Sequence, residues 1–196
     1  FFDYAKCFIT RVKNDEKPFF VYLCTNAPHG PMHSPVSSSK PYSKQGVNLA
    51  NFFGMISNID DNVGAMRAFL KKQGLADNTI FIFTTDNGTS SGANVHNSGM
   101  RGRKGSEYDG GHRVPFFIRW PKGGLTGGRD VETITSYVDV VPTLIDYCQV
   151  PAPKGVKFDG VNIRSLIEGN SKNWPDRILV TDSQRVRDPI KWRKSS

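Results

Sequence analysis

The chain has 196 residues, of which 37% are hydrophobic, so it is long enough for one domain with a substantial core. Charged residues make up 22%, which excludes a chain that is disordered throughout, and no apolar run of about 18 residues predicts a transmembrane helix. The net charge of +8 fits either a solvated basic surface or a surface that attracts an anionic substrate, and no nucleic-acid-binding module accompanies it. The three cysteines, Cys7, Cys24 and Cys148, lack the spacing of a zinc site or a disulfide framework.

The N-terminal part alternates helical and strand patterns. Residues 1–13 carry apolar side chains at a helical period, and FFVYLC (19–24) is a continuous apolar run typical of a strand buried on both faces. A long loop rich in Pro, Gly and Ser follows. Residues 49–73 form the clearest amphipathic helix, and Gly74 stands where a helix C-cap is expected.

The second part continues the alternation. Residues 88–113 are too polar and too long for an ordinary connection, which is typical of a functional loop. Strands are predicted at residues 79–85, 114–121 and 178–182, and a short strand followed by a helix with Pro142 in its first turn within 131–150. We therefore expect an α/β fold with a mostly parallel sheet flanked by helices, over a single domain, 1–196.

Two of the predicted strands end in polar side chains. His29 follows the first, and Asp86 and Asn87 follow the second. If the strands are parallel, these residues lie at the sheet edge where such folds bind ligands. Carboxylate and amide oxygens suit Ca²⁺ or Mg²⁺ rather than zinc.

A tight turn and a glycosylation site compete with a metal site at these residues. Asp-Asn-Gly is a hairpin signal, but no strand follows Gly88. Asn87-Gly88-Thr89 fits a glycosylation sequon, although it adjoins a predicted buried strand. The Gly-rich loop carries four basic side chains, which are either a solvated surface or a site for an oxyanion. They are Arg101, Arg103, Lys104 and His112.

Five separate blocks together resemble the type I sulfatases, which are arylsulfatase-like members of the alkaline phosphatase superfamily. The resemblance covers roughly residues 1–170, as the C-terminal part of the catalytic domain. The blocks are APHGP (27–31), TTDNG (84–88), RGRKGSEYDGGHRVPFFIRWP (101–121), YVDVVPTLID (137–146) and FDGVNIRSLIEG (158–169).

The resemblance implies hydrolysis of sulfate esters at a Ca²⁺ site, with Mg²⁺ as the alternative. It makes Asp86 and Asn87 metal ligands, and Lys104 a contact of the sulfate and the leaving oxygen. His29 becomes a sulfate contact and a candidate general acid. A metal ion together with Lys104 and His29 would stabilise the negative charge that develops on the leaving oxygen.

Other parts of the family pattern are absent. The family's nucleophile is a formylglycine made within Cys-x-Pro-x-Arg or its serine equivalent, and the chain has neither this block nor the N-terminal Asp pair. Cys7 and Arg11 have the right spacing, but Ile9 replaces the proline. Asp60-Asp61 lies inside the long predicted helix. We therefore expect a fragment that is inactive by itself, whose N-terminal half and small C-terminal subdomain lie outside this chain.

Some alternatives stay open. A phosphodiesterase or phosphonate monoester hydrolase of the same superfamily, or a non-catalytic binding fragment, would share these blocks. The resemblance implies a periplasmic, lysosomal or secreted protein. The basic C-terminal segment either favours a sulfated carbohydrate or serves as solubilising charge; its cations are Arg185, Arg187, Lys191 and Arg193.

Overall fold

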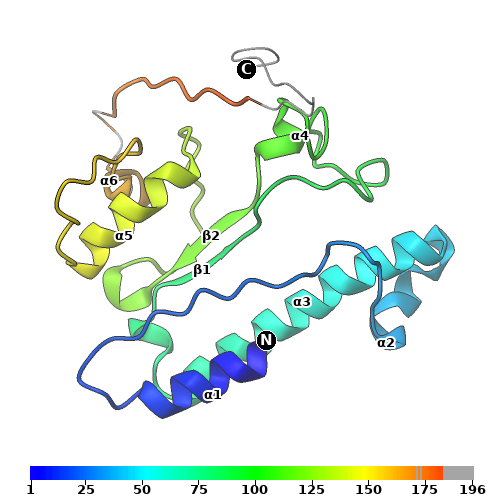
Figure 1. Ribbon diagram of the computed structural model, residues 1–196, viewed down its shortest axis with the longest axis horizontal. Helices are drawn as coiled ribbons and strands as arrows, with labels where there is room; N and C mark the ends of the chain where they lie inside the picture. The colour runs from blue at the N-terminus through cyan, green and yellow to red at the C-terminus, as the bar shows by residue number, and fades with distance from the viewer. Residues whose placement is uncertain (171, 173, 183–196) are drawn as a thin grey trace. The chain divides into compact units, whose positions relative to one another are not determined.

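The structure is a computed structural model that describes residues 1–170, 172 and 174–182 (Figure 1). The described chain divides into two compact units. The first comprises residues 1–77 and 87–113, and the second comprises residues 78–86 and the part of the chain from 114 onward. The basic C-terminal segment, with Arg185, Arg187, Lys191 and Arg193, lies outside the described residues.

The first unit is built on the long helix α3 (Val47–Lys72), which confirms the predicted amphipathic helix. Its buried residues include Phe52, Met55, Met66 and Leu70. Helix α1 (Phe2–Val12) packs against α3, and the short helix α2 (Val36–Ser39) packs near its start (Figure 1).

Helix α3 ends at the predicted glycine. Gly74 has a φ of +71°, a left-handed conformation that glycine adopts without strain. The amide of Leu75 donates to the carbonyl of Leu70 at 2.9 Å, and the amide of Gly74 donates to that of Lys71 at 3.0 Å. These two bonds form a Schellman motif, which satisfies carbonyls left free at the helix end.

The predicted strand at 19–24 is wrong in this structure, because these residues form no regular strand. Their side chains do alternate: Phe19, Val21 and Leu23 are half-buried, whereas Phe20 and its even-numbered neighbours are exposed. The period of two is that of a strand, but a strand also needs ladder hydrogen bonds to a neighbour. Sequence alone cannot supply that neighbour.

The second unit contains the two strands of the described chain. Strand β1 (Phe81–Thr84) pairs with β2 (Phe116–Arg119) in antiparallel register, with Ile82 opposite Ile118. The strands predicted within 131–150 and at 178–182 are wrong, because neither stretch forms a regular strand in the described residues. An α/β chain with an incomplete sheet is confirmed, but this pair is antiparallel, as edge strands of otherwise parallel sheets often are.

Helices α5 (Val140–Cys148) and α6 (Arg164–Ile167) contribute to the hydrophobic core of the second unit. Helix α5 carries Pro142 in its first turn, as predicted, and α6 lies beside it (Figure 1). Trp120 and Trp174 pack against the buried cluster. Its members are Leu125, Tyr147, Ile163, Leu166 and Ile167. The first unit also contains the short helix α4 (Asp109–His112), inside the Gly-rich loop.

A buried carboxylate ties the start of α5 to later segments. Asp139 is 0% exposed and accepts the amides of Ser136 at 2.8 Å and Val161 at 3.0 Å. Arg177 donates to both of its oxygens, at 2.9 and 3.0 Å. Burial opposes ionisation, but the hydrogen bonds from Arg177, Val161 and Ser136 outweigh it and hold the pKa of Asp139 below its usual value.

Tyr147, in the core of the same unit, differs from Asp139 because its buried polar group lacks a hydrogen-bond partner in the described residues. Its side chain packs edge-on against Trp120, with ring centres 5.6 Å apart, and is 6% exposed. Its hydroxyl is buried and has no hydrogen-bond partner among the described residues. Burial, together with the nearby charge of Glu168, raises the pKa of Tyr147 to about 12.

We expect Tyr147→Phe to raise the free energy of unfolding by about 1–3 kcal/mol, the cost of a buried hydroxyl without a partner. In the wild-type protein, the unfolded tyrosine ionises near the ordinary tyrosine pKa of 10.0, whereas the folded one keeps its proton to about pH 12. Wild-type stability should therefore fall as the pH rises through this window, and the variant should lack this part of the fall. Urea unfolding at pH 8 and pH 11, followed by tryptophan fluorescence, measures both effects. A variant less stable than wild type at pH 8 would contradict the expectation.

Candidate functional site

The end of strand β1 is held by side chains from the same unit. The hydroxyl of Thr84 donates to the carbonyl of Pro115 at 2.9 Å, and the hydroxyl of Tyr137 donates to the carbonyl of Thr85. Asp86 follows directly and is exposed. The backbone that leads to this carboxylate is therefore anchored on both sides of the strand end.

Asn87 begins the Gly-rich loop of the first unit. It is half-buried, and the two residues after it bond to the far side of the loop. The amide of Gly88 donates to the carbonyl of Gly111, and the amide of Lys104 donates to the carbonyl of Thr89, both at 2.9 Å. The structure therefore brings the predicted ligand Asn87 and the predicted sulfate contact Lys104 onto adjacent backbone segments. No two-residue hairpin forms at Asp-Asn-Gly, because β2 begins only at Phe116.

Glycines make this close approach possible. A Cβ atom added at Gly88 would collide with the carbonyl oxygen of Gly110, and one added at Gly110 would collide with that of Gly102. One added at Gly111 would collide with the carbonyl oxygen of Ser106. We call Gly88, Gly102, Gly110 and Gly111 the glycine cluster. At Gly88, Gly110 and Gly111 the neighbouring backbone leaves no room for a side chain, and Gly102 has a φ of +79°, which favours glycine.

Asn97 is a supporting residue that the sequence did not single out. Its side-chain amide donates to the carbonyls of Met100 at 2.7 Å and Gly102 at 2.9 Å, and so braces the turn before Lys104. The residue type was the signal that could have found it, since Asn in Gly-rich loops often bonds nearby backbone. Lys104 itself is half-buried, and its ammonium group has no hydrogen bond or ion pair within the described part of the chain.

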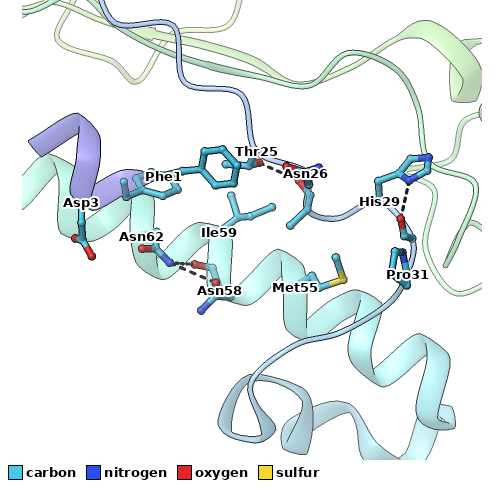
Figure 2. Close-up of a pocket in the computed structure, with 13 residues that line it drawn as sticks. Phe1, Asp3, Thr25, Asn26, His29, Pro31, Met55, Asn58, Ile59 and Asn62 are labelled. Atoms are coloured by element: carbon cyan, nitrogen blue, oxygen red, sulfur yellow. Dashed lines mark hydrogen bonds between the residues drawn. The ribbon is translucent and has the colours of Figure 1, made fainter. Parts of the chain in front are cut away.

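His29 lies at the rim of a pocket of about 450 Å³ in the first unit. Figure 2 shows Asp3 and Phe1 toward one end of the lining residues and His29 toward the other, with Met55, Asn58 and Ile59 of α3 between them. The imidazole Nδ1 is 3.0 Å from the carbonyl oxygen of Gly30, which accepts a hydrogen bond when Nδ1 carries a proton. In that tautomer Nε2 is the nitrogen left for a ligand.

The structure does not join all four predicted site residues. No hydrogen bond within the described residues links His29 to Lys104 or Asn87, and Asp86 belongs to the second unit. No group of three or more His, Cys, Asp or Glu side chains suited to a metal occurs in the described residues. Cys7 is exposed on α1, and Asp60 and Asp61 are exposed on α3; none of the three belongs to such a group in the described residues.

Comparisons with known proteins agree on one family. The Sulfatase family model matches residues 1–150. An uncharacterised sulfatase of Escherichia coli K12, YdeN, is 32% identical over 175 residues, which are 88% of this chain and 31% of YdeN. An arylsulfatase of Clostridium perfringens is 36% identical over 131 residues, covering 66% of this chain and 26% of its own length.

A solved structure shares the fold. The crystal structure of Ps i-CgsB in complex with k-i-k-neocarrahexaose matches with a TM-score of 0.78 and 29% identity, over 85% of this chain and 37% of that one. The chain thus spans between about a quarter and two-fifths of the length of these proteins. In the described residues, no helix is both long enough and apolar enough to cross a membrane.

Proposed function

Because this chain belongs to the sulfatase family, we propose that it supplies part of the active site of a sulfuric ester hydrolase. The observation that carries the proposal is the pairing of Thr89 with Lys104, which holds the cationic loop against the residues that follow Asp86. A sulfate ester needs a cation at its anionic oxygens and a donor for its leaving oxygen. Asp86 and Asn87 would hold that cation, and Lys104 and His29 would supply the donors.

Asp86 and Asn87 would hold the divalent cation, Ca²⁺ in the first place and Mg²⁺ as the alternative. The donor set fits, because a carboxylate and an amide both offer the hard oxygen that these ions prefer. When bound, the cation would draw electron density from the sulfate oxygens as a Lewis acid. The remaining ligands would come from outside this chain.

Lys104 would bind the sulfate and stabilise negative charge on the leaving oxygen. Its ammonium group suits this role because it has no ion-pair partner in the described residues. His29 would need a proton on Nε2 as well as on Nδ1; it would donate from Nε2 to the sulfate and, as the general acid, pass that proton to the leaving oxygen. The nucleophile would be a formylglycine in a Cys-x-Pro-x-Arg block or its serine equivalent, which this chain lacks. The isolated chain would therefore not hydrolyse sulfate esters.

A carbohydrate sulfate is the substrate class that we favour. i-CgsB was crystallised with an oligosaccharide, and the basic charge of this chain suits a polyanion. The enzyme would act in the periplasm, in the lysosome or outside the cell. Phosphonate and phosphodiester substrates of the same superfamily are the alternative that activity assays would separate.

Asp86→Ala in the full-length protein tests the metal assignment. We expect Ca²⁺ affinity to fall on the order of 100-fold or more, since even indirect partners of metal ligands are worth 10–100-fold. Activity should be lost, whereas the far-UV circular dichroism spectrum should not change, because the Asp86 side chain is exposed. Calorimetric Ca²⁺ titration gives the affinity.

The matched control is Asp60→Ala, which removes an exposed carboxylate from α3 and should leave both affinity and activity unchanged. Ca²⁺ binding by Asp86→Ala equal to that of wild type would refute the metal assignment.

A further inference from the structure

Two arginines flank the lysine of the Gly-rich loop. Arg101 and Arg103 are exposed, and together with Lys104 they place three cations within four residues. Their backbone is fixed: the carbonyl of Arg101 accepts the amide of Gly110 at 2.7 Å, and the amide of Arg103 donates to the hydroxyl of Ser106 at 3.1 Å. The cations therefore project from a braced loop.

The guanidinium of Arg101 is also oriented. Its central carbon lies 3.8 Å from the ring centre of Tyr108, so the aromatic face covers one side of the guanidinium plane. The N–H groups at the edge of that plane stay available, in the fork geometry that binds oxyanions with two parallel hydrogen bonds. Stacking thus reduces the freedom that the side chain would lose on binding a ligand.

Neither arginine is neutralised within the described part of the chain. Other arginines of this structure do have carboxylate partners: Arg113 pairs with Asp109, Arg164 with Glu168, and Arg177 with Asp139. No carboxylate of the described residues forms an ion pair with Arg101 or Arg103. Two such guanidinium groups lie close together in the chain, and one of them is held on an aromatic ring, an arrangement suited to a negatively charged group.

We propose that Arg101, held on Tyr108, and Arg103 form a second anion subsite beside the sulfate that Lys104 binds. This inference rests on the proposed function, and it specifies the substrate as a carbohydrate with more than one anionic group. The bound group keeps its bonds: it is a second sulfate, or a carboxylate on a neighbouring sugar, and not the ester that is hydrolysed. The subsite acts on substrate choice rather than on the chemical step.

The test uses the full-length protein and two forms of one disaccharide, carrying one or two sulfate groups. Arg103→Gln should raise KM for the disulfated form about 10-fold, as expected for one charge-assisted hydrogen bond of about 1.4 kcal/mol, with kcat unchanged. KM for the monosulfated form should stay within about twofold of wild type. Arg67→Gln, on an exposed position of α3, removes the same charge elsewhere and should change neither KM.

Tyr108→Leu tests the orientation of the Arg101 guanidinium separately from its charge, because it removes the ring and keeps both arginines. We expect KM for the disulfated form to rise about threefold, from the loss of a stack worth about 0.5–1 kcal/mol. If this variant unfolds, Arg103→Gln still decides the matter, because the Arg103 guanidinium makes no hydrogen bond or ion pair within the described residues that its loss would break. A monosulfated disaccharide with a uronic acid shows whether a carboxylate can occupy the subsite; a KM raised by Arg103→Gln there also supports the proposal.

Equilibrium binding separates failure of the subsite from failure of the proposed function. If the protein hydrolyses no sulfate ester, but Arg103→Gln still weakens calorimetric binding of the disulfated disaccharide about 10-fold, the function is wrong and the subsite stands. If the protein hydrolyses both forms and Arg103→Gln changes neither KM nor binding, the subsite is refuted and the function stands.

Discussion

Replacing Asp139 by asparagine is expected to lower the free energy of unfolding by about 3–5 kcal/mol, the cost of breaking a buried ion pair by removing one partner. The carboxylate is fully buried and accepts four hydrogen bonds, two of them from Arg177, whose side chain is 14% exposed. Asparagine has the same shape but carries no charge and only one acceptor oxygen. The guanidinium of Arg177 would then stay buried without a counter-charge.

Urea unfolding followed by tryptophan fluorescence measures this loss, because Trp120 and Trp174 pack against the core of the same unit. The matched control is Asp146→Asn, which breaks an ion pair with Arg164 at 3.5 Å whose two side chains are each about two-fifths exposed. Exposed pairs contribute about 0–1 kcal/mol, so the control should change stability little. A loss below about 1 kcal/mol for Asp139→Asn, no more than an exposed pair contributes, would show that Arg177 and Asp139 do not stabilise the unit.

The same ion pair makes the free energy of unfolding depend on pH in the acid range. The pKa of Asp139 is lower in the folded state than in the unfolded state, so the folded state binds fewer protons as the pH falls. Its stabilising contribution is present above the unfolded pKa of about 3.8 and is lost as the pH falls through the lower folded pKa. Asp139→Asn should reduce this pH dependence, which tryptophan fluorescence between pH 5 and pH 2 would follow.

Lys104→Ala in the full-length protein is expected to lower kcat on the order of 10²–10³-fold, the usual cost of removing one donor from developing negative charge. The loop should keep its form, because Lys104 is held through its backbone amide on Thr89 and not through its side chain. The effect should grow as the leaving alcohol becomes more basic, since such an alcohol leaves with more negative charge on its oxygen.

Steady-state kinetics with aryl and sugar sulfates tests this dependence. Lys72→Ala, at the exposed end of α3, is the matched control and should behave as wild type. A kcat for Lys104→Ala within twofold of wild type would remove Lys104 from the catalytic site.

Local signals explain which parts of this fold the sequence could predict. The apolar period of α3 and the glycine that ends it are both contained in one stretch of chain, and both are confirmed. The strand at 19–24 was not predictable in the same way. Its apolar residues are right for a strand, but whether a ladder forms depends on segments elsewhere.

The candidate site shows the same division. The position of Asp86 and Asn87 after β1 follows from the strand pattern, whereas the pairing of Thr89 with Lys104 joins residues fifteen positions apart. The bond between Arg177 and Asp139 spans 38 positions, and no periodicity in the sequence encodes it. The roles of His29, Lys104, Asp86 and Asn87 stay predictions until the variants are measured.

The glycine cluster has a consequence for how this loop can change. Since Gly88, Gly102, Gly110 and Gly111 hold the loop through contacts between backbone atoms, its shape owes little to the side chains of Arg101 and Arg103. A library that varies these two positions should keep its folded fraction, whereas one that varies the glycines should lose it. The residues that fix the backbone of this loop are thus different from those proposed to bind the second anion, so that substitutions at the latter need not change the fold.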